Sequence, residues 1–229
     1  MTDPESAAKR VAAEAAAQQV QSGMCLGLGT GSTAWWFIEA IGAQVAAGLE
    51  VTAVASSRAS AEQAQRLGIA LVDLDTRRID LAVDGADQVD AQLRVIKGGG
   101  GAHVRERLLA VAAQRFVVII DPAKLVEQLV RTVPLEILEF GSERTLAGCA
   151  DLGGGPATWR MTATGEPLRS DNGNLLADLD AGVIHDAEGL AAGLDALAGV
   201  VGHGLFLGIT DEVLVGNADG SVQQVLPQR

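Results

Sequence analysis

Hydrophobic and polar positions follow a strand–turn–helix order through the first half of the chain. Short apolar runs bounded by glycine or polar residues predict buried strands at 24–28, 49–55, 69–72, 79–83 and 116–120. Ala-rich or amphipathic segments predict helices at 4–21, 34–46, 58–67 and 102–113. Strands that alternate with helices in this way are typical of an α/β fold with a doubly wound, mostly parallel sheet.

The pattern changes after residue 132 and predicts a second, smaller α+β domain. Strands are expected at 135–140, 158–162 and 175–179, with helices at 142–151 and 187–197. An Asn-Gly pair at 172–173 favours a hairpin turn. Strands at 205–209 and 212–215 are expected to return to the first domain. We therefore predict an α/β catalytic domain over 1–130 plus 206–229, and a ferredoxin-like α+β domain, suited to oligomerisation, over 131–205.

Composition narrows the classes of function. No apolar run among the 229 residues reaches the roughly 18–20 residues that span a bilayer, and the acidic N-terminus lacks a secretory pattern. The net charge of −12 repels phosphate backbones, so we expect no nucleic-acid partner. Two distant cysteines, Cys25 and Cys149, predict buried thiols in a reducing compartment. We expect a cytoplasmic protein without membrane contact.

One glycine-rich segment concentrates the candidate chemistry. Asp84 ends an apolar run and lies three residues before Asp87, with a Gly-Ala turn between them. Lys97 follows a second short apolar run and precedes four glycines, whose backbone amides can approach a ligand closely. Glu106 is expected in the first turn of the next helix. Carboxylates, an ammonium group and accessible amides together suit proton transfer on a small, oxygen-rich anion.

A second glycine-rich turn, residues 29–33, joins the first strand to the next helix. A nicotinamide-binding fingerprint is one interpretation, because Gly27 and Gly29 fit its first two glycines. Ser32 replaces the third glycine, however, and no acidic residue ends the following strand. A phosphate cradle, made of amides at the helix N-terminus and of nearby hydroxyls, agrees better with the pattern. A turn whose hydroxyls only cap the helix is the third interpretation.

Lysine is rare in this chain, and its positions are informative. The three lysines, Lys9, Lys97 and Lys124, stand against 14 arginines. Lys97 and Lys124 follow predicted strands, as Gly29 and Asp84 do. Ligands of open α/β sheets bind outside the carboxyl ends of the strands. We therefore expect these strand ends to form one site.

Several short motifs occur in a fixed order between Lys9 and Gly216. They are Gly-Thr-Gly-Ser-Thr, Ser-Ser-x-Ala-Ser, Asp-Gly-Ala-Asp, Lys-Gly-Gly-Gly, Arg-Glu, Asp-x-x-Lys and Ser-Asp-Asn-Gly-Asn. This ordered set resembles ribose-5-phosphate isomerase of the A type. The resemblance implies interconversion of ribose 5-phosphate and ribulose 5-phosphate through an enediolate, in the non-oxidative pentose phosphate pathway. It also implies no cofactor, no metal, and a homodimer or homotetramer.

The resemblance implies a role for each candidate residue. Glu106 is the base that moves a proton between C2 and C1. Asp84, Asp87 and Lys97 bind the sugar hydroxyls, assist ring opening and stabilise the oxyanion. The phosphate end is held by Thr30, Gly31, Ser32 and Thr33, with positive charge from Lys124 and Lys9. The remaining substrate-binding positions are backbone-lined turns at Gly85, Ala86, Gly98, Gly99 and Gly100.

Some positions depart from the family, and two other functions compete. His103 stands where the family is apolar, and we expect a solvated or capping histidine, with tuning of Glu106 as the alternative. Arg58 replaces an aspartate that is frequent in the family.

A non-catalytic sugar-phosphate sensor would need a DNA-binding module, and every segment of this sequence is already assigned to one of the two predicted domains. Acyl-CoA transfer would need a nucleophilic glutamate and a CoA site, and no motif marks one.

Overall fold

The computed structural model describes residues 3–75, 78–130 and 132–227, which divide into two compact units. The first unit comprises Met1–Ala86, Arg105–Leu125 and Gly208–Arg229. The second comprises Asp87–Val104 and Val126–Leu207. Segment 87–104 therefore belongs to the second unit, although it lies between two parts of the first in the sequence.

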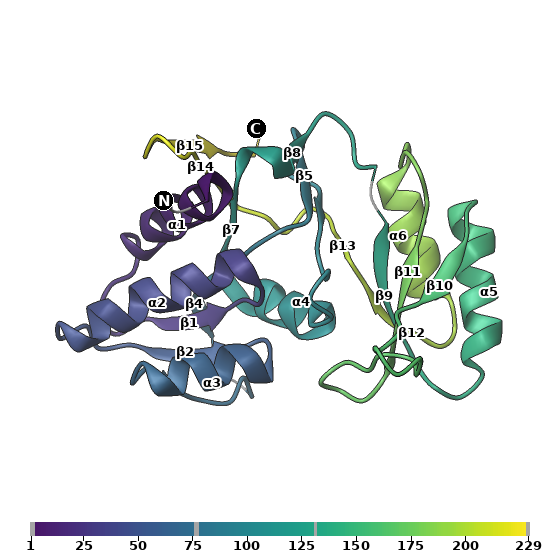
Figure 1. Cartoon of the computed structure of the whole chain (residues 1–229), viewed down its shortest axis with the longest axis horizontal. Helices are drawn as coiled ribbons and strands as arrows, with labels where there is room; N and C mark the ends of the chain where they lie inside the picture. Colours follow the sequence, from purple (N-terminus) through teal and green to yellow (C-terminus); the bar gives the residue numbers. More distant parts are fainter. Residues whose placement is uncertain (1–2, 76–77, 131, 228–229) are drawn as a thin grey trace. The chain divides into compact units, whose positions relative to one another are not determined.

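A seven-stranded sheet forms the centre of the first unit (Figure 1). Its order is β15-β14-β7-β4-β1-β2-β3, and every neighbouring pair is parallel except the outer pair β14–β15. The strands are β1 (Cys25–Leu28), β2 (Thr52–Ala55), β3 (Ala70–Leu71), β4 (Ile79–Asp84), β7 (Ala113–Ile120), β14 (Glu212–Gly216) and β15 (Val222–Val225). The predicted α/β class with a mostly parallel sheet is confirmed, while β15 was not predicted.

Helices connect and cover these strands. They are α1 (Pro4–Ala17), α2 (Ser32–Ala46), α3 (Arg58–Arg66) and α4 (His103–Ala112). Phe37 and Ile41 lie four residues apart on one face of α2 and are fully buried against strand residues such as Leu28 and Ile119. Helix α1 ends at Ala17, four residues before its predicted end, because the chain turns there toward β1. None of the described helices combines the length and apolar character needed to cross a membrane.

The strand order reverses beside β1, which pairs with β2 on one side and with β4 on the other. The carboxyl ends of β1 and β4 therefore lie at a topological switch point, where open α/β sheets bind their ligands. The backbone N–H of Gly29, just past β1, donates to the carbonyl of Val83 in β4 (3.0 Å). The first glycine-rich turn and Asp84 both leave the sheet at this point.

The second unit contains an antiparallel sheet of order β10-β11-β9-β12 with two helices. An antiparallel bridge between Arg169 and Leu175 confirms the hairpin turn predicted around Asn172-Gly173. The predicted strand 135–140 was too long: it ends at Ile137, and Phe140 is 91% exposed just before the next helix. The elements are β9 (Val133–Ile137), α5 (Ser142–Gly153), β10 (Ala157–Trp159), β11 (Leu175–Leu179), α6 (Ala187–Ala196) and β12 (Val200–His203), the last not predicted.

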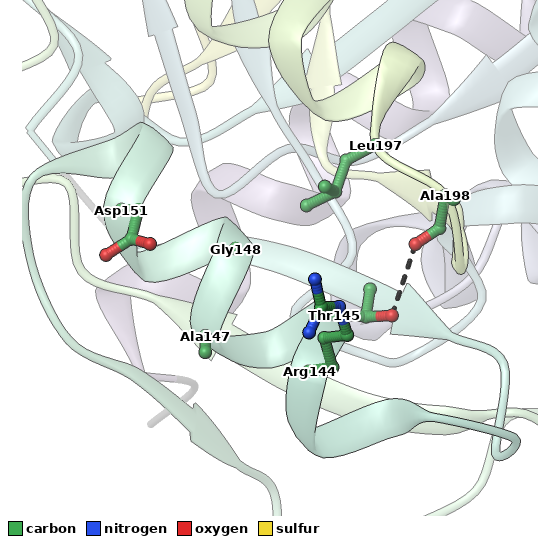
Figure 2. Close-up of a pocket in the computed structure, with 7 residues that line it drawn as sticks. All are labelled: Arg144, Thr145, Ala147, Gly148, Asp151, Leu197 and Ala198. Atoms are coloured by element: carbon green, nitrogen blue, oxygen red, sulfur yellow. Dashed lines mark hydrogen bonds between the residues drawn. The ribbon is translucent and has the colours of Figure 1, made fainter.

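A hollow of about 490 Å³ lies along α5 (Figure 2). The hydroxyl of Thr145 donates to the carbonyl of Ala198 beside it (3.2 Å), which ties α5 to the segment after α6. The lining residues are Arg144, Thr145, Ala147, Gly148, Asp151, Leu197 and Ala198. None of them belongs to the predicted site.

Short strands complete the second unit: β5 (Gln88–Asp90) pairs with β6 (Val95–Ile96), and β6 pairs with β13 (Leu205–Phe206), all antiparallel. Segment 205–209 was expected to return to the first domain, but its strand β13 pairs with β6 in the second unit instead. The strand β8 (Leu125–Val126) follows a 3-10 turn at Pro122–Lys124.

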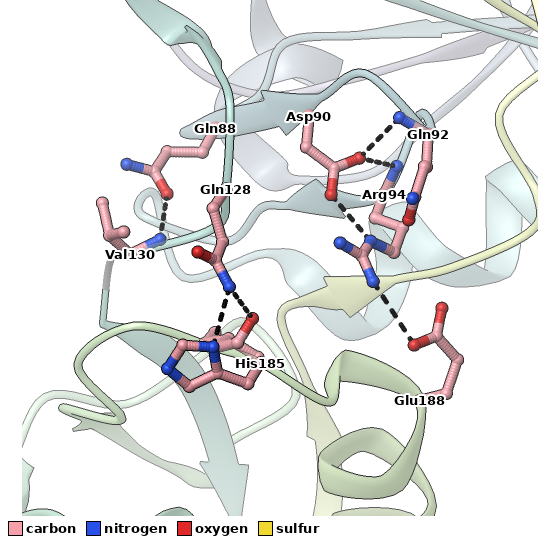
Figure 3. Close-up of polar contacts among 9 residues, drawn as sticks. Gln88, Asp90, Gln92, Arg94, Gln128, Val130, His185 and Glu188 are labelled. Carbon is pink, nitrogen blue, oxygen red and sulfur yellow. Dashed lines mark hydrogen bonds and ion pairs between the residues drawn. The ribbon is translucent and has the colours of Figure 1, made fainter.

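Polar contacts anchor segment 88–94 to its unit (Figure 3). The buried Asp90 carboxylate accepts from Arg94 Nε (2.7 Å), and Arg94 also reaches Glu188 of α6 (3.5 Å). Gln88 Oε1 accepts from the backbone N–H of Val130 (2.9 Å). These contacts explain why a segment between two parts of the first unit packs with the second.

A buried carboxylate on β9 holds the hairpin turn of the second unit. Glu136 is fully buried, and its Oε1 accepts from Ser170 Oγ (2.8 Å), Asn172 Nδ2 (3.0 Å) and Asn174 Nδ2 (2.8 Å). One acceptor therefore satisfies three side-chain donors. The Ser-Asp-Asn-Gly-Asn motif folds back onto the sheet because of this carboxylate.

Replacing Glu136 tests this arrangement. Glu136→Ala should lower the free energy of unfolding by about 3 kcal/mol, because three donors lose their acceptor and a cavity remains. Urea unfolding followed by circular dichroism measures the loss. The matched control is Glu139→Ala, which removes an exposed carboxylate paired with Arg169 and should leave the midpoint nearly unchanged. Equal midpoints for both variants would contradict the role of Glu136.

Candidate active site

Asp84 joins the carboxyl end of β4 to the turn after β1. Its Oδ1 accepts from the backbone N–H of Thr30 (3.0 Å) and from that of Gly85 (2.7 Å), and the residue is 3% exposed. A Cβ atom at Gly29 would lie 2.1 Å from this carboxylate, so only glycine allows the approach. The turn and the carboxylate thus hold each other in place at the switch point.

The side chain of Thr30 is surrounded by the hydroxyl groups of three serines. The Thr30 hydroxyl lies 2.7 Å from Ser56 Oγ and donates to Ser57 Oγ (2.9 Å), while Ser60 Oγ donates to the Gly29 carbonyl (2.6 Å). These serines follow β2, whose carboxyl end lies beside that of β1. They were not among the predicted site residues. Their position after a strand adjacent to β1 is the signal that could have found them.

The N-terminus of α2 has a cation beside it. Lys9 Nζ donates to Ser32 Oγ (3.0 Å) and forms an ion pair with Glu5 (2.5 Å). This pairing with Lys9, and more weakly the charge of Lys124, lowers the pKa of Glu5. Two of the three lysines therefore act on one carboxylate near the predicted phosphate cradle. Backbone N–H groups at the start of a 15-residue helix, a hydroxyl and ammonium groups are what a phosphate requires.

The second unit contains Asp87, Lys97 and the glycine loop 98–101. Asp87 Oδ2 accepts from the backbone N–H of Gly99 (2.9 Å). Lys97 is 2% exposed, and its ammonium lies 5.7 Å from the centre of the Phe206 ring. This distance lies within the range of a cation–π contact and places the ammonium group at the end of β6, over the Phe206 ring. A further polar cavity of about 240 Å³ is lined by Asp87, Gly99, Thr132, Pro134, Arg160 and Asp178.

Glu106 lies in the first turn of α4 and is 4% exposed. His103 begins the same helix but is fully buried, so the expectation of a solvated histidine was wrong. Burial, and to a smaller extent the charges of Arg160 and His203, lowers the pKa of His103 to about 3. The histidine is therefore neutral at physiological pH and adds no positive charge to the site.

Within each unit the structure assembles part of the predicted set. In the first, Asp84 contacts the turn at Thr30, and Lys9 contacts Ser32. In the second, Asp87 contacts the glycine loop after Lys97. Convergence of all these residues on one ligand stays a prediction. Among the described residues, no group of three His, Cys, Asp or Glu side chains is arranged to hold a metal ion.

Comparison with known proteins identifies the family. The profile described as ribose 5-phosphate isomerase A (phosphoriboisomerase A) matches residues 52–220. The ribose-5-phosphate isomerase A of Haloarcula marismortui is 46% identical over 220 residues, 96% of each chain. The chain belongs to the ribose-5-phosphate isomerase A family. The protein of that name from Methanosarcina acetivorans is 43% identical, across 100% of this chain and 98% of its own.

Solved structures of the ribose-5-phosphate isomerase A family have the same fold. The enzyme from Methanocaldococcus jannaschii gives a TM-score of 0.90 at 34% identity, over 95% of this chain and 97% of its own. A D-ribose-5-phosphate isomerase in complex with phospho-erythronic acid gives 0.92 at 32% identity, over 98% and 100%. The fold and the family predicted from the motifs are therefore confirmed.

The close approach of Gly29 to Asp84 leads to a test. Gly29→Ala should lower the isomerisation rate by about a hundredfold, because a methyl group would displace the Asp84 carboxylate by an ångström or more. Steady-state kinetics with ribose 5-phosphate measures the loss. Gly193→Ala is the control, since Gly193 lies within helix α6, where a Cβ atom would meet only the end of the exposed Leu152 side chain at 3.1 Å. A Gly29→Ala enzyme as active as the control would contradict the assigned contact.

The buried His103 predicts an acid-sensitive fold. Between about pH 6.5 and 3 the unfolded chain binds a proton at this residue and the folded protein does not, so acidification favours unfolding by up to about 1.4 kcal/mol per pH unit. His103→Asn should reduce this pH dependence, while Asn at the exposed His185 should not. Urea unfolding at several pH values measures both. Parallel stability curves for wild type and His103→Asn would refute the assignment.

Proposed function

We propose that this chain interconverts ribose 5-phosphate and ribulose 5-phosphate with Glu106 as the base. The reaction removes a proton from C2 of the open-chain aldose, forms an enediolate, and returns a proton to C1. One carboxylate that accepts and then releases the proton serves both steps. Membership of the ribose-5-phosphate isomerase A family supports the reaction, and the burial of Glu106 at the start of α4 supports its role.

The observation that carries the proposal is that the N-terminus of α2, which is suited to bind a phosphate group, lies next to the fixed carboxylate of Asp84 at the switch point of the sheet. Ser32 and Lys9 are in contact at the N-terminus of α2, and Asp84 is bound to the preceding turn. We assign the phosphate of the substrate to Thr30, Gly31, Ser32 and Thr33, with Lys9 and Lys124. The solved relative with phospho-erythronic acid supports a sugar-phosphate ligand.

We assign different roles to the three carboxylates according to the hydrogen bonds that each one makes. Asp84 Oδ1 already accepts two backbone N–H bonds, which fix its position and suit it for binding a sugar hydroxyl. Glu106 carries the proton in this proposal. Asp87 is similarly fixed, by the N–H of Gly99, and we assign it to hydroxyl binding and ring opening.

Developing negative charge on the enediolate needs a partner that is already in place. Lys97 is a buried ammonium group held over Phe206, so it needs little reorganisation during the reaction. We assign it to the oxyanion, with the backbone amides of Gly98, Gly99 and Gly100. Gly85 and Ala86 line the sugar beside Asp84. In this proposal neither a metal nor an organic cofactor takes part.

We also infer a cytoplasmic homodimer or homotetramer of the pentose phosphate pathway. Two buried free thiols, Cys25 and Cys149, support a reducing compartment. Burial raises the pKa of Cys149 to about 11, which makes it an unreactive thiol. We assign oligomerisation to the domain at 131–205 and catalysis to 1–130 plus 206–229.

Replacing Glu106 tests its proposed role. Glu106→Gln should lower kcat at least about a hundredfold and change KM little, because a positioned base contributes that much to the rate while binding is unaffected. Ketose absorbance from ribose 5-phosphate, measured with a chelator present, reports the rate. Glu62→Gln on α3 is the exposed control and should be fully active.

Each outcome of that assay separates one account from the others. Near-normal turnover in Glu106→Gln would remove Glu106 from the role of base. Loss of wild-type activity to the chelator would contradict the metal-free reaction. A wild-type protein that binds ribose 5-phosphate without forming ketose would instead be a sugar-phosphate sensor.

A further inference from the structure

The guanidinium group of Arg160 links strand β11, through Asp178, to the glycine loop 98–101 within the second unit. Its Nε and Nη2 donate to the two oxygens of Asp178 (2.8 and 2.7 Å). Its Nη1 donates to the carbonyl oxygens of Gly98 and Gly99, both at 3.0 Å. One planar group therefore binds a carboxylate on one side and two loop carbonyls on the other.

Arg160 is itself well anchored. Its backbone N–H donates to the carbonyl of Leu176 (2.9 Å), and its carbonyl accepts from Leu168 (2.7 Å). The side chain is only 14% exposed, and Asp178 lies on the neighbouring strand β11. An exposed arginine would lose the free energy of these bonds to side-chain entropy, but this one is already ordered by its surroundings.

The direction of the loop amides follows from these contacts. The C=O and N–H of one peptide group point in opposite directions. Because Arg160 binds the carbonyls of Gly98 and Gly99, the N–H groups of Gly99 and Gly100 point away from it. The N–H of Gly99 reaches Asp87 (2.9 Å). The N–H of Gly100 likewise points away from Arg160, since the Gly99 carbonyl of the same peptide group faces the guanidinium.

The loop cannot be held there by packing of its own side chains, since it has none. Gly98 has a φ of +102°, and a Cβ at this position would lie 2.6 Å from that of His103. A loop of glycines loses much conformational entropy on ordering and needs external bonds to keep one shape. Arg160 supplies two of them.

We propose that Arg160 is a positioning residue that orients the glycine-loop amides toward the substrate. This inference rests on the proposed function, in which the amides of Gly98, Gly99 and Gly100 bind the reacting sugar. Arg160 acts through the loop and not on the substrate itself. Its bonds keep the amides ready for the enediolate before the reaction begins, which is where preorganisation lowers the barrier.

The role requires arginine and not merely a positive charge. A lysine ammonium has no planar fork and cannot bind both oxygens of Asp178 and two carbonyls at once. Arg160→Lys should therefore lower kcat about tenfold or more, with KM within about threefold, because the loss falls on the transition state. Arg160→Ala should lose at least as much, and added guanidinium at non-denaturing concentration should restore part of its activity.

Arg169→Ala is the matched control. Arg169 also bridges a carboxylate, Glu139, and a glycine carbonyl, Gly173 (2.9 Å), on the same unit, but it is 47% exposed and does not contact the loop. This variant should retain wild-type kcat and KM. Hydrogen exchange of loop 98–101 should speed up in Arg160→Lys and stay unchanged in the control.

The combined results separate the possible failures. Faster loop exchange, a lower kcat and rescue by guanidinium would establish the positioning role. A kcat within twofold of wild type in a folded Arg160→Lys would overturn it, whatever the exchange result. Equal losses of kcat in the Arg160 and Arg169 variants would also overturn it. A wild-type protein that forms no ketose would refute the proposed function instead, and the loop-exchange result would still report on the bonds from Arg160.

Discussion

The hydrogen bonds from the Thr30 and Gly85 amides to Asp84 Oδ1 are the constraint on which the rest of the first unit's site depends. They join the turn after β1 to the end of β4 at the place where the strand order reverses. Gly29 has to be glycine so that the carboxylate can come close. Once this turn is fixed, the N-terminus of α2 and the hydroxyls of Ser32 and Thr33 follow in a defined direction.

The second unit uses the same principle with different residues. A backbone turn without side chains is held by charged groups at its edges: Asp87 accepts from the Gly99 amide, and Arg160 donates to the Gly98 and Gly99 carbonyls. In both units a glycine turn supplies close approach, and a buried or half-buried charged group supplies rigidity. A glycine turn can offer its amides to a ligand in a fixed geometry only when such contacts restrict its backbone conformation.

The sequence was sufficient for the central strands of the parallel sheet, such as β1, β4 and β14, because they are buried almost throughout and appear as continuous apolar runs. It also predicted correctly that Asp84 and Lys97 lie at the ends of strands. It missed β12 and β15, whose residues are mostly exposed or half-buried and form no continuous apolar run, and it gave β13 the wrong partner, because pairing is decided by distant segments and not by local pattern. His103 was misjudged because a polar residue at a helix start looks like a cap until the surrounding packing is known.

Contacts between side chains far apart in the sequence were the least predictable part of the site. Ser56, Ser57 and Ser60 approach Thr30 only because β2 pairs with β1, and Arg160 contacts a glycine loop that lies more than 60 residues earlier in the sequence.

A crystal structure with phospho-erythronic acid tests the central claim most directly. The account predicts the phosphate at the N-terminus of α2 beside Ser32 and Lys9, with the Glu106 carboxylate within about 3.5 Å of the carbon chain. A phosphate bound elsewhere, or a Glu106 carboxylate more than about 6 Å from every ligand carbon, would contradict it.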